Sequence, residues 1–157
     1  MSSFAPSPAV TAGERFRLGL AASRYNPELV DALLAQVLAA WQAAGVKEKN
    51  VTVVRVPGSH ELPVAIQLLA GSGRLDCLVA LGVLVGGDTS HHQLVGASVS
   101  HALQAVALAA RVPVINGVVV ADTPAQARVR CLGRRARGAE FAAAALEMAA
   151  LKRTLSS

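Results

Sequence analysis

The apolar residues of the chain fall into two kinds of segment that alternate along the sequence. The first kind is a short, nearly continuous apolar run, as expected for a strand that is buried on both faces of a sheet. These runs occupy residues 16–22, 51–56, 77–85 and 114–120. In the second kind, apolar residues recur at helical spacing, as at Leu29, Leu33 and Val37. The pattern predicts four strands separated by helices.

Proline and glycine mark the ends of the predicted helices. Pro27 and Pro124 occupy positions where a first helical turn tolerates proline, Gly45 follows the first helix, and Pro113 ends the longest one. The predicted helices cover residues 28–44, 61–70, 91–111, 124–132 and 138–152. Strands that alternate with helices favour an α/β fold with a parallel sheet and right-handed crossovers.

Composition indicates a single domain with an apolar surface. The chain has 157 residues, of which 53% are apolar and only 16% are charged. A chain of this length buries one core, and so few charges leave apolar surface for contacts between subunits. We therefore expect a homo-oligomer. Residues 1–12, rich in Ser, Pro and Ala, are predicted to form a flexible N-terminal arm, and residues 13–157 a single domain.

The net charge of +5 has a local origin. Five arginines fall within ten residues: Arg128, Arg130, Arg134, Arg135 and Arg137. Such a patch serves phosphorylated ligands, nucleic acid, or no specific partner. Nucleic acid is the least favoured of these, because no aromatic residue lies among the arginines to stack on bases.

The remaining sequence signals concern location and cysteine chemistry. No apolar run is expected to reach the length of a membrane span, and the N-terminus lacks the features of a signal peptide. We therefore expect a cytoplasmic protein. Cys77 and Cys131 lie far apart, which favours buried free thiols over a disulfide or a metal site.

The predicted site lies where the strands end. Ligands of open parallel sheets bind outside the carboxyl ends of the strands. We expect four parts of the chain to meet there: residues 23–26, 57–61 and 85–91, and Asn116. In the third of these, two glycines and a hydroxyl-rich helix start form a cradle for an anion. His91 beside this cradle has the side chain suited to moving protons near neutral pH.

The motifs in these stretches, taken together, resemble those of the lumazine synthase family. The resemblance covers residues 16–152 in order and spacing. It rests on Arg24-Tyr-Asn26, Val56-Pro-Gly-Ser-His-Glu-Leu-Pro63, Leu81-Gly-Val-Leu-Val-Gly-Gly-Asp-Thr-Ser-His91, Pro113-Val-Ile-Asn-Gly117, Gln126-Ala with Arg130, and Arg137-Gly-Ala-Glu140.

The resemblance implies a flavodoxin-like three-layer sandwich, with a four-stranded parallel sheet flanked by helices. It also implies subunits that form pentamers, which occur alone, in pairs as decamers, or as shells of sixty subunits, with active sites between neighbours. The implied reaction condenses 5-amino-6-ribitylaminouracil with 3,4-dihydroxy-2-butanone 4-phosphate in riboflavin biosynthesis. No cofactor and no metal are expected.

The resemblance also assigns roles to individual residues. His91 is the implied proton carrier, supported by Glu140. The implied substrate-binding residues are Tyr25, Asn26, Ser59, His60, Glu61, Leu84, Val85, Asn116, Arg137 and Glu140. The implied phosphate-binding residues are Gly87, Asp88, Thr89 and, from the neighbouring subunit, Arg130.

Four positions depart from the family pattern. Gly86 stands where the family usually has arginine, so the loop is expected to lose a cation and gain flexibility. His60 replaces an aromatic residue, Asn116 replaces a residue such as phenylalanine, and the linker at residues 132–137 is one residue shorter. These departures keep open an alternative function, that of a paralogue that binds lumazine or flavin or forms a shell without synthase activity.

Several polar residues have simpler interpretations. His92 and His101 are expected to be structural, because His92 is adjacent to His91 and therefore faces another way on the helix. His60 is expected to be a partly buried wall residue. The Asp88 side chain is expected to turn away from the phosphate and cap the helix, since like charges repel.

Overall fold

The chain folds around a four-stranded parallel sheet. The computed structural model describes residues 7 and 9–156, so most of the predicted N-terminal arm, residues 1–12, lies outside the described residues. The strands are β1 (Leu18–Ser23), β2 (Val51–Val56), β3 (Cys77–Val85) and β4 (Val114–Ala121). Their order is β2-β1-β3-β4, and every pairing is parallel. The predicted strands are therefore confirmed to within a few residues at their ends.

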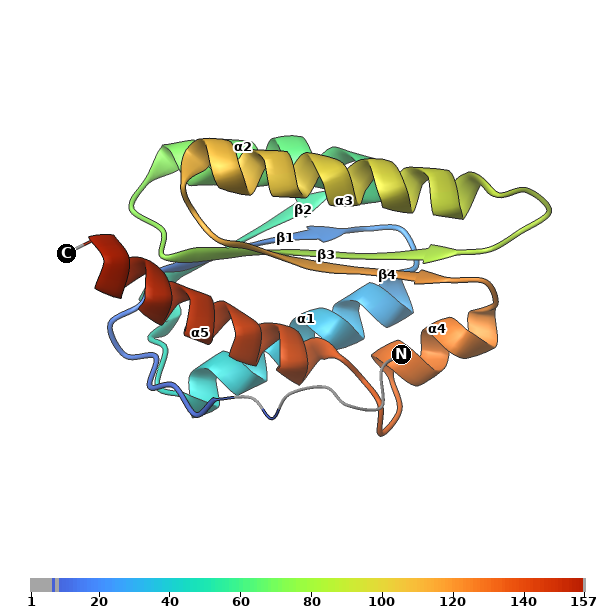
Figure 1. Cartoon of the computed structure of the whole chain (residues 1–157). Helices are drawn as coiled ribbons and strands as arrows, with labels where there is room; N and C mark the ends of the chain where they lie inside the picture. Colours follow the sequence, from blue (N-terminus) through green and yellow to red (C-terminus); the bar gives the residue numbers. More distant parts are fainter. Residues whose placement is uncertain (1–6, 8, 157) are drawn as a thin grey trace.

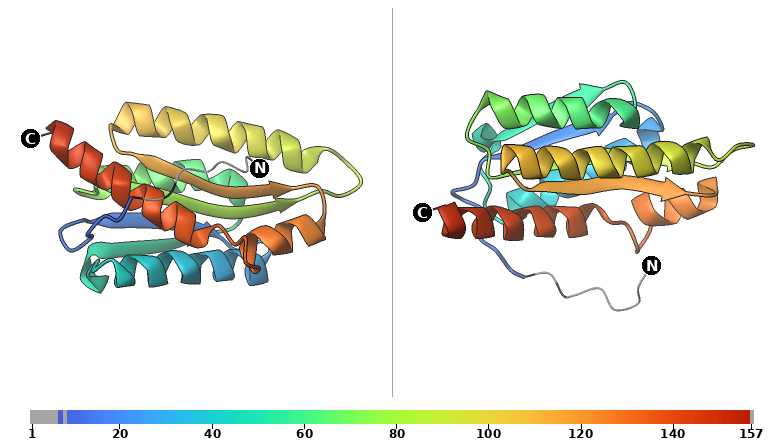
Figure 2. Two further views of the ribbon diagram at one scale, coloured as in Figure 1. Left: turned by 60° about the horizontal axis from the view of Figure 1, so that its bottom comes forward. Right: turned by 45° about the horizontal axis from the view of Figure 1, so that its top comes forward.

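Helices cover both faces of the sheet (Figure 1). They are α1 (Pro27–Ala43), α2 (Leu62–Ser72), α3 (His91–Ala110), α4 (Pro124–Cys131) and α5 (Gly138–Ser156), with short 3-10 turns at Glu48–Asn50 and Ser59–Glu61. α2 and α3 lie side by side on one face, and α1, α4 and α5 lie on the other (Figures 1 and 2). This arrangement confirms the predicted three-layer α/β sandwich, and its strand order is that of flavodoxin-like folds.

The continuous apolar run of β3 is explained by a core on each side of the sheet. Val79 and Leu81 belong to the core shared with α1 and α5, whereas Leu78 and Ala80 belong to the core under α2 and α3. Successive side chains of a strand point to opposite faces, so both sets must be apolar. On the first side Trp41 is 1% exposed, and its indole Nε1 donates to the Ala142 carbonyl at 3.2 Å.

Helix α3 leaves much of its apolar surface uncovered. It is 20 residues long, and by length and composition it is apolar enough to cross a membrane, so the expectation that no apolar segment reaches that length was wrong. In the fold α3 packs on α2 and β4 as part of one helical layer. Only 17% of its apolar window is buried, and Leu94 and Leu108 are each 71% exposed. A single chain therefore presents an apolar helix face to its surroundings.

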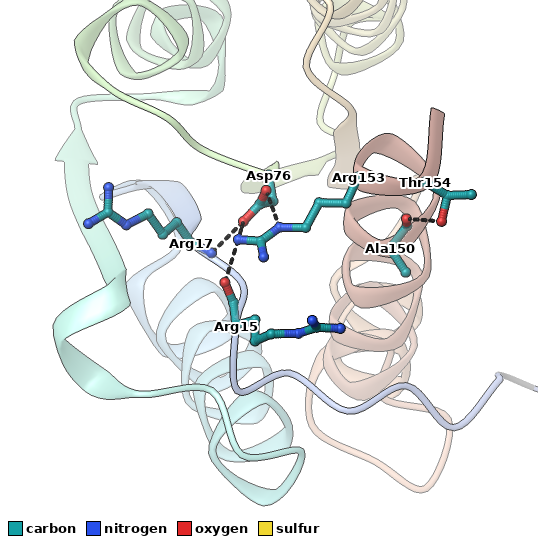
Figure 3. Close-up of polar contacts among 6 residues, drawn as sticks. All are labelled: Arg15, Arg17, Asp76, Ala150, Arg153 and Thr154. Atoms are coloured by element: carbon teal, nitrogen blue, oxygen red, sulfur yellow. Dashed lines mark hydrogen bonds and ion pairs between the residues drawn. The ribbon is translucent and has the colours of Figure 1, made fainter. Parts of the chain in front are cut away.

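An ion pair fastens the last helix to the amino edge of the sheet (Figure 3). Arg153 donates to both carboxylate oxygens of Asp76, at 2.8 and 2.9 Å, and the Arg17 backbone N–H donates to the same carboxylate at 2.7 Å. Arg153 also donates to the Arg15 carbonyl. Burial by itself raises the pKa of the Asp76 carboxyl, but these hydrogen bonds outweigh it and hold the pKa below its ordinary value. The carboxylate therefore stays ionised although its side chain is only 8% exposed.

Replacing Arg153 with alanine is expected to lower the free energy of unfolding by about 2–3 kcal/mol at pH 7. The estimate lies below that for a fully buried pair because the Arg153 side chain is 41% exposed. A depressed folded-state pKa contributes stability above the unfolded-state value, and that contribution disappears as the pH falls through the folded-state pKa. Urea titrations at pH 7 and pH 3 measure the difference in the free energy of unfolding between the variant and the unmodified chain. This difference should be smaller at pH 3.

Arg15→Ala is the matched control for this experiment. The Arg15 side chain points away from Asp76, and only its backbone carbonyl meets Arg153 (Figure 3). Its replacement is therefore expected to change stability by less than about 0.5 kcal/mol. If Arg153→Ala lowered the free energy of unfolding by the same amount at pH 3 and at pH 7, the ion pair would not be the source of that loss.

Candidate functional site

A cavity of about 520 Å³ opens at the carboxyl ends of β1, β2 and β3. It lies where parallel sheets place their ligand sites, and its volume suits a small molecule. Most of the predicted site residues meet in its wall: Tyr25, Asn26, Ser59, His60, Glu61, Leu84, Val85, Gly87, Thr89 and His91. The structure thus brings together residues from three segments that are far apart in the sequence.

The turn after β1 places Tyr25 at the cavity mouth. Asn26 has φ 52°, in the left-handed region that asparagine tolerates better than most residues. Its side-chain Nδ2 donates to the Val83 carbonyl at 2.8 Å, which ties the turn to β3. Tyr25 is 71% exposed, and its ring lies so close to Gly58 that a Cβ there would be 3.3 Å from the Tyr25 Cδ2 atom. The aromatic ring is therefore held at the lip with one face open.

Glu61 enters the cavity from the 3-10 turn after β2. One of its carboxylate oxygens, Oε2, accepts from the Gly58 backbone N–H at 2.8 Å. Glu61 is half-buried, and its other oxygen has no hydrogen-bond partner among the described residues. The turn therefore presents an oriented acceptor to the cavity. His60, beside it, is exposed, so the expectation that it is partly buried was wrong for the single chain.

The loop at residues 86–90 is held against the end of β4. The Gly86 N–H donates to the Ala121 carbonyl at 2.8 Å, and a Cβ on Gly86 would lie 2.4 Å from the Asp122 carbonyl oxygen. Glycine here permits close packing of two main chains, so the interpretation of Gly86 as a source of flexibility was wrong. Gly87, in contrast, has open space around it.

Helix α3 begins directly after this loop, without a side-chain cap. Its N-cap residue is Ser90, which makes no capping hydrogen bond through its side chain, so the expected capping role of Asp88 is wrong. Asp88 is exposed and is not part of the cavity wall. The first turn of a long helix with no side-chain cap keeps backbone N–H groups and a positive dipole end available for an anion.

The two adjacent histidines of α3 differ in environment. His91 is exposed and lines the cavity opposite Glu61. His92 is 9% exposed, and its Nε2 lies 3.1 Å from Oδ1 of Asp122. The hydrogen bond from His92, followed by that from Gln93, lowers the pKa of the Asp122 carboxyl. His92 therefore has the predicted structural contact, whereas His91 is open to a ligand.

Asn116 does not lie at the rim. It is the third residue of β4, pairs with Ala80, and its Oδ1 accepts from the Val118 N–H at 3.0 Å. Because β4 continues to Ala121, the residue at its carboxyl end is Asp122, and the prediction that Asn116 reaches that edge was wrong. Asn116 is exposed on the outer strand of the sheet.

The predicted residues of α4 and α5 also lie outside the cavity wall of the single chain. Arg130 donates from Nη1 to the Val120 carbonyl at 3.3 Å. Arg137 and Glu140 form an ion pair with an N–O distance of 2.9 Å, and this hydrogen bond lowers the pKa of the Glu140 carboxyl. Within one chain Glu140 therefore contacts Arg137, and the structure shows no contact between Glu140 and His91.

Sequence reasoning missed part of the cavity wall. Gly58, Val83, His92 and Val95 complete it, and Asp122 supports it through His92. Asp122 is recognisable in the sequence from its place immediately after the fourth apolar run. The apolar wall residues Val83 and Val95 could not be recognised from the sequence, because nothing distinguishes them from other apolar residues of a strand or helix.

The cysteines have the predicted free, buried state. Burial raises the pKa of the Cys77 thiol to about 12 and that of the Cys131 thiol to about 11, so neither forms a reactive thiolate near neutral pH. Among residues 7 and 9–156, no group of three or more His, Cys, Asp and Glu side chains is arranged to hold a metal ion.

Fold and cavity together define an α/β protein with a small-molecule site at the carboxyl edge of a parallel sheet. The model of the 6,7-dimethyl-8-ribityllumazine synthase family matches residues 15–153. The chain belongs to this family.

Proteins of that name from several organisms are similar to this chain over nearly its whole length. The relative from Edwardsiella ictaluri is 43% identical over 142 residues, which cover 88% of this chain and 90% of the relative. Those from Halorhodospira halophila and Thermococcus gammatolerans are each 40% identical, and they cover 88% and 91% of this chain and 90% and 92% of their own lengths.

Proposed function

We propose that the chain condenses 5-amino-6-ribitylaminouracil with 3,4-dihydroxy-2-butanone 4-phosphate to 6,7-dimethyl-8-ribityllumazine, releasing phosphate and water. It acts as a cofactor-independent transferase of riboflavin biosynthesis in the cytoplasm. The observation that carries the proposal is the meeting of His91, Glu61 and the loop 86–90 in one cavity of a chain that belongs to the lumazine synthase family.

The uracil substrate occupies the part of the cavity between β1, β2 and β3. Tyr25 stacks on the pyrimidine ring with its open face. Asn26 and the free oxygen of Glu61 bind the ribityl hydroxyls, together with backbone groups of Ser59 and His60. Backbone groups of Leu84 and Val85, at the end of β3, bind the uracil edge.

The phosphate of the second substrate binds at the start of α3. Gly87, Asp88 and Thr89 offer main-chain N–H groups, and the helix dipole favours a negative group there. The open space around Gly87 permits close approach of the phosphate. The carboxylate of Asp88, which is not in the cavity wall, does not oppose the phosphate at contact distance.

His91 moves protons between the two bound substrates. The amine attacks the ketone carbonyl and loses water as an imine forms; phosphate then leaves, and the ring closes with loss of water. Each step needs a proton removed from nitrogen or carbon, or given to oxygen, which an exposed imidazole beside both subsites supplies. Holding two substrates in attack geometry provides much of the remaining acceleration.

A neighbouring subunit completes the site. Asn116, Arg130, Arg137 and Glu140 lie outside the cavity of their own chain. Among the described residues Arg130 is paired only with the Val120 carbonyl, so its charge is available to a phosphate. The uncovered apolar face of α3 gives a second copy a surface to pack on, and closed homo-oligomers use such surfaces. We propose a pentamer, alone, paired as a decamer, or assembled into a shell of sixty subunits.

Mixing the purified chain with both substrates tests the proposal, because lumazine formation is followed directly against the uncatalysed reaction. Acceleration over that background is expected. Lumazine binding without acceleration would instead support the paralogue that binds the product and does not make it. Light scattering of the same sample should give a mass that is a multiple of five chains.

A further inference from the structure

We propose that His92 and Asp122 are a pair of positioning residues that fix the loop at residues 86–90, which we call the phosphate loop, in its binding conformation. The inference rests on the proposed function, since it assigns the loop its ligand. Neither residue is among those expected to touch a substrate. Their role follows from the fact that both ends of the loop are held at the end of β4, one by Ala121 and the other by Asp122.

The start of the phosphate loop is attached to the end of β4. Gly86 donates its N–H to the Ala121 carbonyl at 2.8 Å, which extends the pairing of β3 and β4 by one residue. The Cα of Gly86 then packs against Asp122 so closely that a Cβ would lie 2.4 Å from its carbonyl oxygen and 3.0 Å from its carbonyl carbon. The loop therefore leaves β3 in contact with the end of β4.

The other end of the loop is attached to the Asp122 side chain. His92 lies two residues beyond Ser90, and its Nε2 is 3.1 Å from Asp122 Oδ1. The side-chain Nε2 of Gln93 donates to the same oxygen at 3.4 Å. The loop thus runs between a hydrogen bond to Ala121 and one to the Asp122 side chain, two neighbouring residues, which limits the conformations the loop adopts.

Asp122 is itself held from the far side. Its backbone N–H donates to Gln126 Oε1 at 2.9 Å, and Thr123 caps α4 by accepting from the Gln126 N–H at 3.2 Å. The attachment point is thereby part of the junction between β4 and α4. The helix that carries Arg130 and the loop that binds the phosphate share this junction.

His92 has no second partner that explains its burial. Its Nδ1 is buried and makes no hydrogen bond in the described part of the chain, so the Nε2 contact with Asp122 is the only polar interaction of the ring. When an imidazole donates from Nε2, its Nδ1 is an acceptor, and a buried acceptor without a hydrogen bond lowers the stability of the fold. The presence of a histidine here is explained by its hydrogen bond to Asp122 and not by packing alone.

The expected effect is confined to the phosphorylated substrate. His92→Leu fills a similar volume and removes the donor, and it should raise the KM for 3,4-dihydroxy-2-butanone 4-phosphate about tenfold, with kcat and the KM for the uracil substrate changed less than about twofold. His92→Gln keeps an N–H donor and should restore most of the affinity. Asp122→Ala should behave as His92→Leu does, and the double variant should be no worse than either.

Lys49→Leu, at an exposed position before β2 and outside the cavity wall, is the control and should leave all three constants unchanged. Equal changes in the KM of both substrates, or single effects that multiply in the double variant, would overturn the inference.

Calorimetric titration with inorganic phosphate separates this inference from the proposed function, because it requires no turnover. His92→Leu should bind phosphate about tenfold more weakly than the unmodified chain. If the unmodified chain makes no lumazine, the proposed function fails and this titration alone decides the inference. Equal phosphate affinity in the two proteins, or no phosphate binding by the unmodified chain, would overturn it.

Discussion

Replacing His91 with alanine is expected to lower kcat by about 10²-fold or more, the usual contribution of one general acid–base group, without abolishing lumazine formation. His91 is the exposed imidazole in the cavity wall, and its removal leaves the phosphate loop and the uracil subsite in place. Residual activity is expected because positioning of the two substrates does not depend on the imidazole. Steady-state kinetics of the variant and the unmodified chain measure the ratio.

Lys49→Ala serves as the control for His91→Ala, since it removes an exposed side chain before β2, outside the cavity wall. Its kcat should equal that of the unmodified chain. A His91→Ala enzyme with full kcat would remove the histidine from the mechanism. Circular dichroism of both variants should match the unmodified spectrum, because an exposed side chain contributes little to stability.

Replacing Arg130 with alanine is expected to lower kcat/KM for the phosphorylated substrate by about 10- to 100-fold, the usual range for a lost hydrogen bond to a charged group. In the described part of its own chain Arg130 has a carbonyl as its one partner, which leaves its guanidinium for the proposed phosphate contact in a neighbouring site. Initial rates at varied butanone phosphate concentration measure the effect, and inorganic phosphate should inhibit the variant more weakly.

Arg128→Ala is the matched control, because Arg128 lies on the same helix and is already paired with Glu28 at 2.9 Å. Its kcat/KM is expected to change less than about twofold, as for an exposed ion pair. Equal losses in the two variants would show that the arginine patch acts only through its overall charge.

The architecture was predictable because local signals agreed with the final packing. Strands buried on both faces require continuous apolar runs, and β3 is such a run from Cys77 to Val85. Pro27 and Pro124 indicated where α1 and α4 begin, and the structure confirms both helix starts. The uncovered face of α3 was harder to foresee, because the apolar spacing of a helix does not say which of its sides another element covers.

The site was predictable where a residue follows a strand directly, and not elsewhere. Asn116 was misplaced because it lies inside a strand, five residues before its end at Ala121. The tight packing of Gly86 on Asp122 depends on two segments far apart in the sequence, so composition alone suggested flexibility. Residues that we propose one chain contributes to another, such as Arg130, leave no signal in the geometry of a single chain.

The most direct test of a site shared between subunits is to mix the two impaired variants. His91→Ala and Arg130→Ala chains, co-expressed with different tags and purified by both, form mixed oligomers. If each cavity takes His91 from one chain and Arg130 from its neighbour, random assembly leaves about a quarter of the sites intact, and about a quarter of the unmodified activity should return. Activity no higher than the mean of the two variants alone would contradict the shared site.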